Sequence, residues 1–294
     1  EVMALLRVLE GFTHLGIVIA APVLMAEATP AKWRGTVMVL WSTFFGVSFA
    51  ILAWIAVPNI EELGISGLFH FHSLLLVLIA GLVHIGFPNN DHPTKTCRRP
   101  KQKKSKFLRP LFDLRVIWPG FSWLFYTLTF LALVTILPSL TDDSLRSSLT
   151  ASMALAATTA SILVVPVLLK RFNATSVVLA GFSMAALTTF LGLILPVACI
   201  AVVLLSVLGI VQGATFASVT ELNQTSMDQS FCYGLMAQTG NLCKLIGTPL
   251  LLGVLELSDV DALLLTCTAI YVIGCLALGL LLPNIATEDR RIGS

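Results

Sequence analysis

Residues 174–219 read ATSVVLAGFSMAALTTFLGLILPVACIAVVLLSVLGIVQGATFASV and contain no Asp, Glu, Lys or Arg. One bilayer crossing needs about 20 apolar residues, and this stretch is about twice that length. Because proline interrupts a helix, we expect the chain to turn back at Pro196 and to cross a membrane twice. Over all 294 residues, 56% are hydrophobic and only 12% are charged, against about 25% charged in soluble domains. The sequence therefore predicts an all-α polytopic membrane protein.

Nine segments have the length and composition of membrane-spanning helices. One long connection, residues 88–115, contains four prolines and separates three spans from six. The expected organisation is a three-span part at 1–87, a basic loop at 88–115, a six-helix bundle at 116–283 and a tail at 284–294. The chain begins inside an apolar helical pattern without an initiator Met, so we expect preceding sequence to be missing. The spans are 5–26, 37–57, 68–87, 116–137, 149–169, 177–195, 197–219, 231–255 and 262–282.

Lys and Arg are concentrated in alternate connections between these spans. Of the 18 Lys and Arg residues, only Arg146 lies in the opposite set of connections, near acidic positions such as Glu61 and Asp142. By the positive-inside rule, the basic set and the C-terminus face the cytoplasm. We expect the loop at 88–115 to contact anionic lipid headgroups; a nucleic-acid contact is the less favoured alternative. The basic set contains Lys32, Arg34, Lys95, Arg98, Arg99, Lys101, Lys103, Lys104, Lys106, Arg109, Arg115, Lys170, Arg171, Arg290 and Arg291.

Two short motifs near the start of the chain carry a family resemblance. They are Arg7-Val-Leu-Glu10-Gly11 and Glu27-Ala-Thr-Pro30-Ala-Lys32-Trp-Arg34-Gly35. The first resembles the R-x-x-Q-G motif of the fourth helix of the major facilitator superfamily. The second matches E-x-x-P-x-x-x-R-G, the turn into the fifth helix, at every fixed position. The resemblance implies that the nine spans are helices four to twelve of a twelve-helix transporter.

The sequence also departs from the family pattern. Glu10 stands where the motif usually has Gln, and residues 35–46 lack the G-P-x-x-G-G pattern of the drug/proton antiporter branch. Around Arg171 the signature G-x-x-x-D-R-x-G-R-R keeps the arginine and loses the aspartate. The resemblance implies that one group of residues belongs to loops that move during transport: Glu27, Pro30, Arg34, Gly35 and Arg171.

Polar residues within spans are the candidates for a binding or coupling site. Transporters of this fold bind substrate near the bilayer midplane, where a charged side chain costs about 2.5–3.5 kcal/mol and needs a partner or a wet cavity. On the first span, Arg7, Glu10 and His14 share one face. Alternatively, Arg7 and Glu10 form a structural ion pair and His14 is a hydrogen-bonded packing residue. Further candidates are Gln212, Gln238 and Asn241.

Lys244 is the most informative of these residues. It lies deep in the eighth span, too far from either end for its amine to reach the interface readily. We therefore expect it to face a cavity, although pairing with an acidic residue would also explain it. Lys244 and Arg7 together would suit an anionic substrate such as a small carboxylate.

The leading hypothesis is a secondary active transporter of a small solute, working by alternating access and coupled to an ion or proton gradient. The chain contains no G-x-x-x-x-G-K-[ST], G-x-S-x-G or H-E-x-x-H motif. His70 and His72 suit a position at the level of the lipid headgroups better than a metal site. We expect no enzyme activity, cofactor, metal or nucleic-acid partner. We expect a monomer in a cell membrane, and the compact loops suggest a bacterial inner membrane. The alternatives are a transport-inactive receptor or regulatory subunit of the same fold, and a membrane-embedded enzyme.

Overall fold

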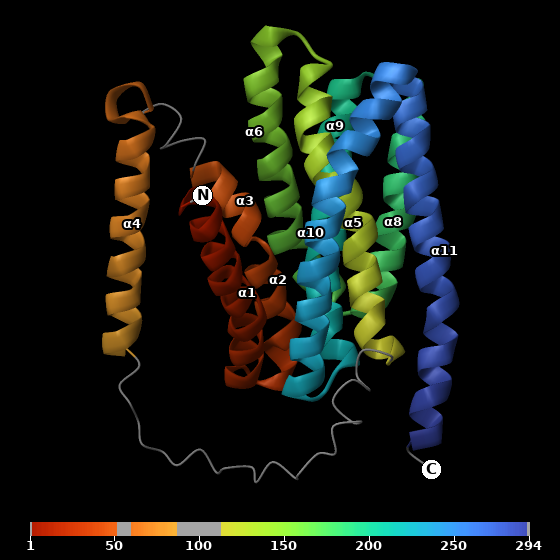
Figure 1. Ribbon diagram of the computed structural model, residues 1–294. Helices are drawn as coiled ribbons and strands as arrows, with labels where there is room; N and C mark the ends of the chain where they lie inside the picture. The colour runs from red at the N-terminus through yellow and green to blue at the C-terminus, as the bar shows by residue number, and fades with distance from the viewer. Residues whose placement is uncertain (1, 52–59, 87–112, 293–294) are drawn as a thin grey trace. The chain divides into compact units, whose positions relative to one another are not determined.

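The computed structural model describes residues 2–51, 60–86 and 113–292, and all regular elements in these ranges are helices. The chain divides into two units, residues 1–47 with 110–294, and residues 48–109. The helices are α1 (Val2–Ala28), η1 (Ala31–Trp33), α2 (Arg34–Ser42), α3 (Phe44–Ile51), α4 (Ile60–Gly86), α5 (Leu114–Ser139), α6 (Asp143–Thr159), η5 (Ala160–Val164), α7 (Val165–Leu168), α8 (Ala174–Leu191), α9 (Val197–Leu222), α10 (Ser226–Leu257) and α11 (Val260–Ile292) (Figure 1).

Eight helical segments in the described ranges are long and apolar enough to cross a membrane. They confirm the all-α class and eight of the nine predicted spans. The predicted span at 37–57 is described only as far as residue 51. Within this part the helix is interrupted at Thr43, between α2 and α3. Most of the predicted loop at 88–115 lies outside the described residues.

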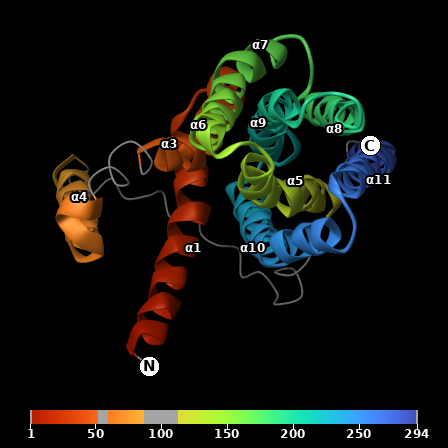
Figure 2. The ribbon, with the colours of Figure 1, turned by 90° about the horizontal axis from the view of Figure 1, so that it is seen from above.

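The turn at Pro196 is confirmed. Helix α8 ends at Leu191, Pro196 caps α9, and α8 and α9 pack against one another. Helix α9 also contacts α2, α5 and α6, and every residue from 211 to 219 is buried. Viewed along the helices, α9 lies beside α5 and α8 (Figure 2). This helix is therefore the centre of the larger unit.

Two helices begin at least five residues before the predicted span starts. The span predicted at 149–169 begins at Asp143, after the N-cap Asp142, and continues through the π-helical segment η5. The span predicted at 231–255 begins at Ser226, where the Thr225 hydroxyl accepts a hydrogen bond of 3.1 Å from the Asp228 amide. Hydropathy marks the part of a helix that lies in lipid, whereas polar caps set where the helix begins.

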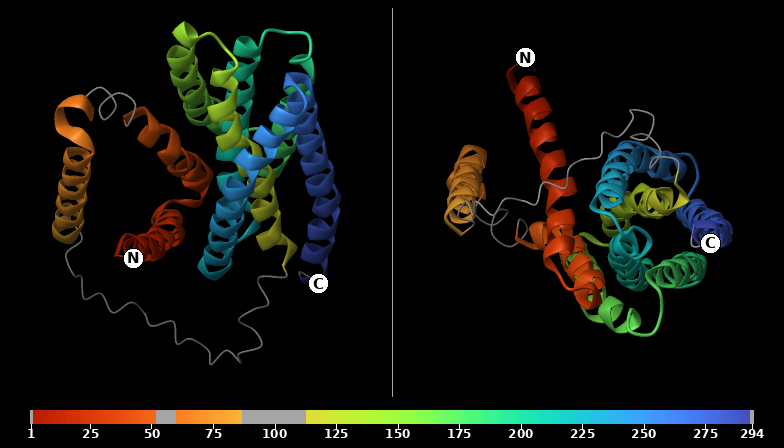
Figure 3. Two further views of the ribbon diagram at one scale, coloured as in Figure 1. Left: turned by 45° about the horizontal axis from the view of Figure 1, so that its top comes forward. Right: turned by 90° about the horizontal axis from the view of Figure 1, so that it is seen from below.

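Helix α1 joins the bundle by its C-terminal half. Val23 and Ala26 are buried, whereas residues 2–14 are exposed. Two views along the helices show the N-terminal end of α1 pointing away from α5, α9 and α10 (Figures 2 and 3). The contact with α10 therefore involves the C-terminal half of α1, which leads into the turn at 29–33.

In the smaller unit, α4 contains the described apolar span. Gly64 has φ 65°, a left-handed conformation that glycine adopts without steric cost, and the span Gly64–Gly86 follows it. The helix ends at Gly86, one residue before the predicted end of this span. Residue 87 is outside the described residues.

Candidate functional site

A small cavity, here called the central cavity, lies among α1, α3, α5, α9 and α10. Its volume of about 40 Å³ exceeds the 10–15 Å³ that one water needs. It brings together three of the residues predicted from sequence: His14 on α1, and Asn241 and Lys244 on α10. The remaining lining residues are Leu15, Val18, Phe44, Trp123, Phe216, Tyr233, Met236, Ala237 and Gly240.

Lys244 gives the central cavity its charge. It is half-buried and lies 13 residues before the end of α10 at Leu257, or about 20 Å along the helix. Among the described residues that line this cavity, none is acidic. An ammonium group in such a setting attracts an anion more strongly than it would in water, because the surrounding dielectric is lower.

Aromatic side chains from three helices form one wall of the central cavity. The ring centroids of Trp123 and Phe216 are 5.1 Å apart in an edge-to-face arrangement, and those of Phe216 and Tyr233 are 6.0 Å apart in a stacked one. The Tyr233 hydroxyl donates to the sulfur of Met38 on α2 at 2.9 Å. These contacts fix the wall that faces Lys244. Sequence reasoning did not select Phe216 or Tyr233, because an aromatic residue in an apolar helix carries no signal of what it faces.

Arg7 and Glu10 lie outside the central cavity. Arg7 Nη1 donates to Glu10 Oε2 at 2.7 Å, and their side chains are 60% and 63% exposed. The pairing that sequence reasoning allowed is therefore present. Exposed pairs of this kind contribute little stability. A coupling role for either residue remains a prediction.

Gln212 and Gln238 also lie outside the cavity lining. Gln238 is exposed, whereas Gln212 is only 6% exposed and joins three helices. The Tyr126 hydroxyl of α5 donates to Gln212 Oε1 at 2.8 Å, and Gln212 Nε2 donates to the Ser42 carbonyl of α2. Gln212 is thus part of a bridge between α2, α5 and α9.

Replacing Gln212 by Leu should destabilise the protein by about 1–3 kcal/mol, because the buried partners Tyr126 and Ser42 lose a hydrogen bond. In a thermal unfolding experiment on purified protein, this corresponds to a decrease of about 2–4 °C per kcal/mol. The matched control is Gln238→Leu, an identical change at an exposed position of α10. Equal melting temperatures for the two variants would contradict a stabilising role for the bridge.

The loop residues implied by the family resemblance lie at the end of the bundle where α1 meets α10. Ser226 at the start of α10 donates its hydroxyl hydrogen to the Glu27 carboxylate. Arg34 Nε donates to the Thr29 carbonyl at 3.2 Å. Pro30 precedes η1 as its N-cap, and Arg171 is exposed in the loop between α7 and α8. The hydrogen bond of Ser226 with Glu27 connects the C-terminal end of α1 to α10, and that of Arg34 with Thr29 lies within the α1–α2 turn.

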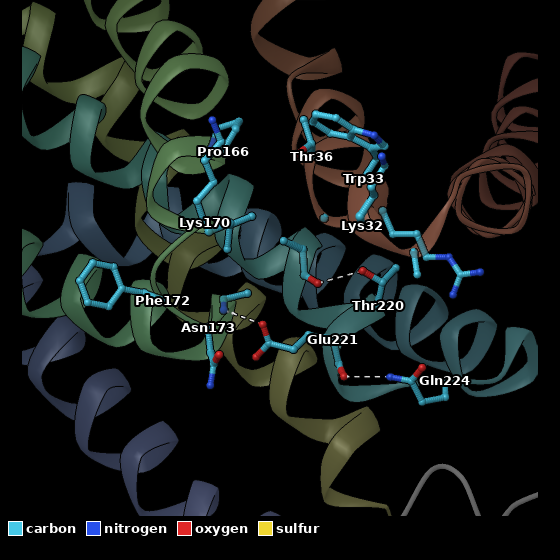
Figure 4. Close-up of a pocket in the computed structure, with 16 residues that line it drawn as sticks. Lys32, Trp33, Thr36, Pro166, Lys170, Phe172, Asn173, Thr220, Glu221 and Gln224 are labelled. Carbon is cyan, nitrogen blue, oxygen red and sulfur yellow. Dashed lines mark hydrogen bonds between the residues drawn. The ribbon is translucent and has the colours of Figure 1, made fainter.

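A second and larger cavity, here called the loop cavity, lies beside these residues. Its volume is about 520 Å³. It is formed by the α1–α2 turn, the α7–α8 loop and the C-terminal end of α9 (Figure 4). A Cβ atom on Gly35 would lie 3.4 Å from Leu169 and 3.8 Å from Ala217, so this glycine sits where α2 approaches α7 and α9 closely.

The comparisons with known proteins agree with this architecture. A sequence profile of the Major Facilitator Superfamily matches residues 2–248, most of the chain. The chain belongs to this superfamily, and it is a multi-pass membrane protein of the transporter class.

Among solved structures, the chain is similar to the human organic anion transporter MFSD10 (TETRAN), with a TM-score of 0.60 and 16% sequence identity. The match covers 90% of this chain and 68% of that one. At this identity the similarity supports the fold. Among curated protein sequences, none matches.

Proposed function

We propose that this chain forms the greater part of a secondary active transporter that carries a small organic anion by alternating access. The observation behind the proposal is the central cavity, which Lys244 and Asn241 of α10 line together with His14 of α1 and in which no described lining residue is acidic. Lys244 would pair with the anion, and Asn241 would donate hydrogen bonds to it. That MFSD10 is described as an organic anion transporter is consistent with this substrate class.

The proposal includes a proton as the coupling ion, and it includes a membrane topology. His14 lines the same cavity as Lys244, and histidine is the side chain that most readily changes charge near neutral pH. The proton would offset the negative charge of the substrate. The distribution of Lys and Arg supports a cytoplasmic C-terminus. The family resemblance supports a twelve-helix arrangement and a location in a cell membrane.

Counterflow in proteoliposomes tests the proposed function. Vesicles loaded with an unlabelled small carboxylate should accumulate the radiolabelled compound from outside, and cationic or neutral solutes of similar size should not exchange. Because counterflow needs no ion gradient, it detects transport before the coupling ion is known. Binding of the carboxylate without counterflow would instead identify a receptor of the same fold.

A further inference from the structure

We propose that the loop cavity binds the phosphate headgroup of an anionic phospholipid. The cavity shares no described lining residue with the central cavity, and its volume of about 520 Å³ is typical of ligand pockets. Figure 4 shows Lys32 and Trp33 of η1 on one side, and Lys170 and Phe172 of the α7–α8 loop on the other. The two loops thus contribute side chains to one site.

The charge of the loop cavity favours an anion. Lys32, Arg34 and Lys170 line it together with a single carboxylate, that of Glu221. This carboxylate already accepts hydrogen bonds from the Ala174 amide at 2.6 Å and the Thr175 hydroxyl at 3.4 Å. Glu221 therefore caps the N-terminus of α8, and the cavity keeps a net positive charge.

The three cations keep donors for a ligand. Within the described ranges, neither ion pair that the structure contains involves Lys32, Arg34 or Lys170. Arg34 uses its Nε for the Thr29 carbonyl, which leaves its two terminal nitrogens, and Lys32 Nζ lies 5.7 Å from the centroid of the Trp33 ring. A phosphate accepts several hydrogen bonds at once, which matches this arrangement.

The apolar part of the lining distinguishes a lipid from a soluble anion. Trp33 and Phe172 are 51% and 55% exposed, and Pro166 and Leu169 also belong to the lining. The cavity also lies at the depth expected for lipid headgroups, because the membrane span Ser144–Leu168 ends beside it and the span Ala174–Leu191 begins there. Tryptophan is enriched at this interface, and basic pockets between membrane helices bind anionic headgroups.

A lipid in this cavity would link the two loops. Its phosphate would contact Lys32 in η1, Arg34 at the start of α2 and also Lys170 after α7. The same end of the bundle holds the hydrogen bond between Ser226 and Glu27. Lipid binding would therefore stabilise the arrangement in which the α1–α2 turn rests against α10.

Native mass spectrometry of the full-length protein released from nanodiscs tests the proposal. Nanodiscs of phosphatidylcholine with phosphatidylglycerol should yield protein that retains phosphatidylglycerol in preference to phosphatidylcholine. In the double variant Lys32→Gln/Lys170→Gln, the affinity for phosphatidylglycerol should fall about 30-fold, because each lysine beside an anionic headgroup contributes about fivefold. The charge-preserving variant Lys32→Arg/Lys170→Arg should keep most of the binding.

Two controls separate the proposal from its competitors. Arg146→Gln removes a charge near the opposite end of the span Ser144–Leu168 and should leave lipid binding unchanged. Inorganic phosphate, titrated against detergent-solubilised protein, tests for a soluble anion. The proposal is overturned if the Gln double variant retains as much phosphatidylglycerol as the wild type, or if inorganic phosphate binds as tightly as the lipid. Comparable melting temperatures of the Gln and Arg double variants show that a loss of binding is not a loss of folding.

Discussion

Lys244→Ala should strongly reduce uptake of the anionic substrate, and Lys244→Arg should retain more of it. Lys244 contributes the positive charge of a central cavity that has no acidic residue in its described lining. Removing the charged partner of a bound anion costs about 2 kcal/mol or more, which is a loss of about 30-fold in affinity. Arginine keeps the charge but is longer and planar, so its geometry fits a site built for an amine only partly.

Leu245→Ala is the matched control for this experiment. Leu245 is the next residue of α10, does not line the central cavity and is 73% exposed, as expected of a side chain that faces lipid. Initial rates of radiolabelled carboxylate uptake, corrected for the amount of reconstituted protein, should be close to wild type in this variant. Equal uptake by wild type, Lys244→Ala and Lys244→Arg would remove Lys244 from the substrate path.

The spans could be predicted from sequence because lipid imposes a simple rule on length and polarity. Pro196 shows this clearly, since an apolar run of double length has to turn at the proline. The interruption at Thr43 could not be predicted in this way. The hydroxyls of Ser42 and Thr43 hydrogen-bond to the carbonyls of Val39 and Leu40 within α2, and hydropathy does not register such local competition.

The candidate site could be predicted only in part, for a related reason. His14 and Lys244 could each be selected from sequence, because a polar side chain inside an apolar helix is costly and needs an explanation. Their convergence on one cavity depends on how α1 packs against α10, and no local pattern encodes that. Lys32 and Lys170 were assigned a role in topology from the loop charges alone. Their position on opposite sides of one cavity appears only once the loops are folded together.

Gly247→Ala should strongly destabilise the packing between α5 and α10, because these helices approach closely at Gly247. A Cβ atom built on Gly247 would lie 2.1 Å from the backbone carbonyl oxygen of Leu128. Backbone cannot rotate away as a side chain can, so Gly247→Ala should force the two helices apart. Overpacking of this kind costs about 3 kcal/mol, and the melting temperature should fall by about 6–12 °C.

The same helix offers a matched control. No atom lies within 4 Å of a Cβ atom built on Gly253, so Gly253→Ala should leave the melting temperature unchanged or raise it slightly, since alanine favours a helix by about 1 kcal/mol over glycine. A thiol-reactive fluorophore can report unfolding of both variants, because Cys232 and Cys267 are fully buried until the bundle opens. A Gly247→Ala variant as stable as Gly253→Ala would contradict the close packing of α5 on α10. It would also weaken the placement of Lys244, which lies about one turn earlier on the same helix.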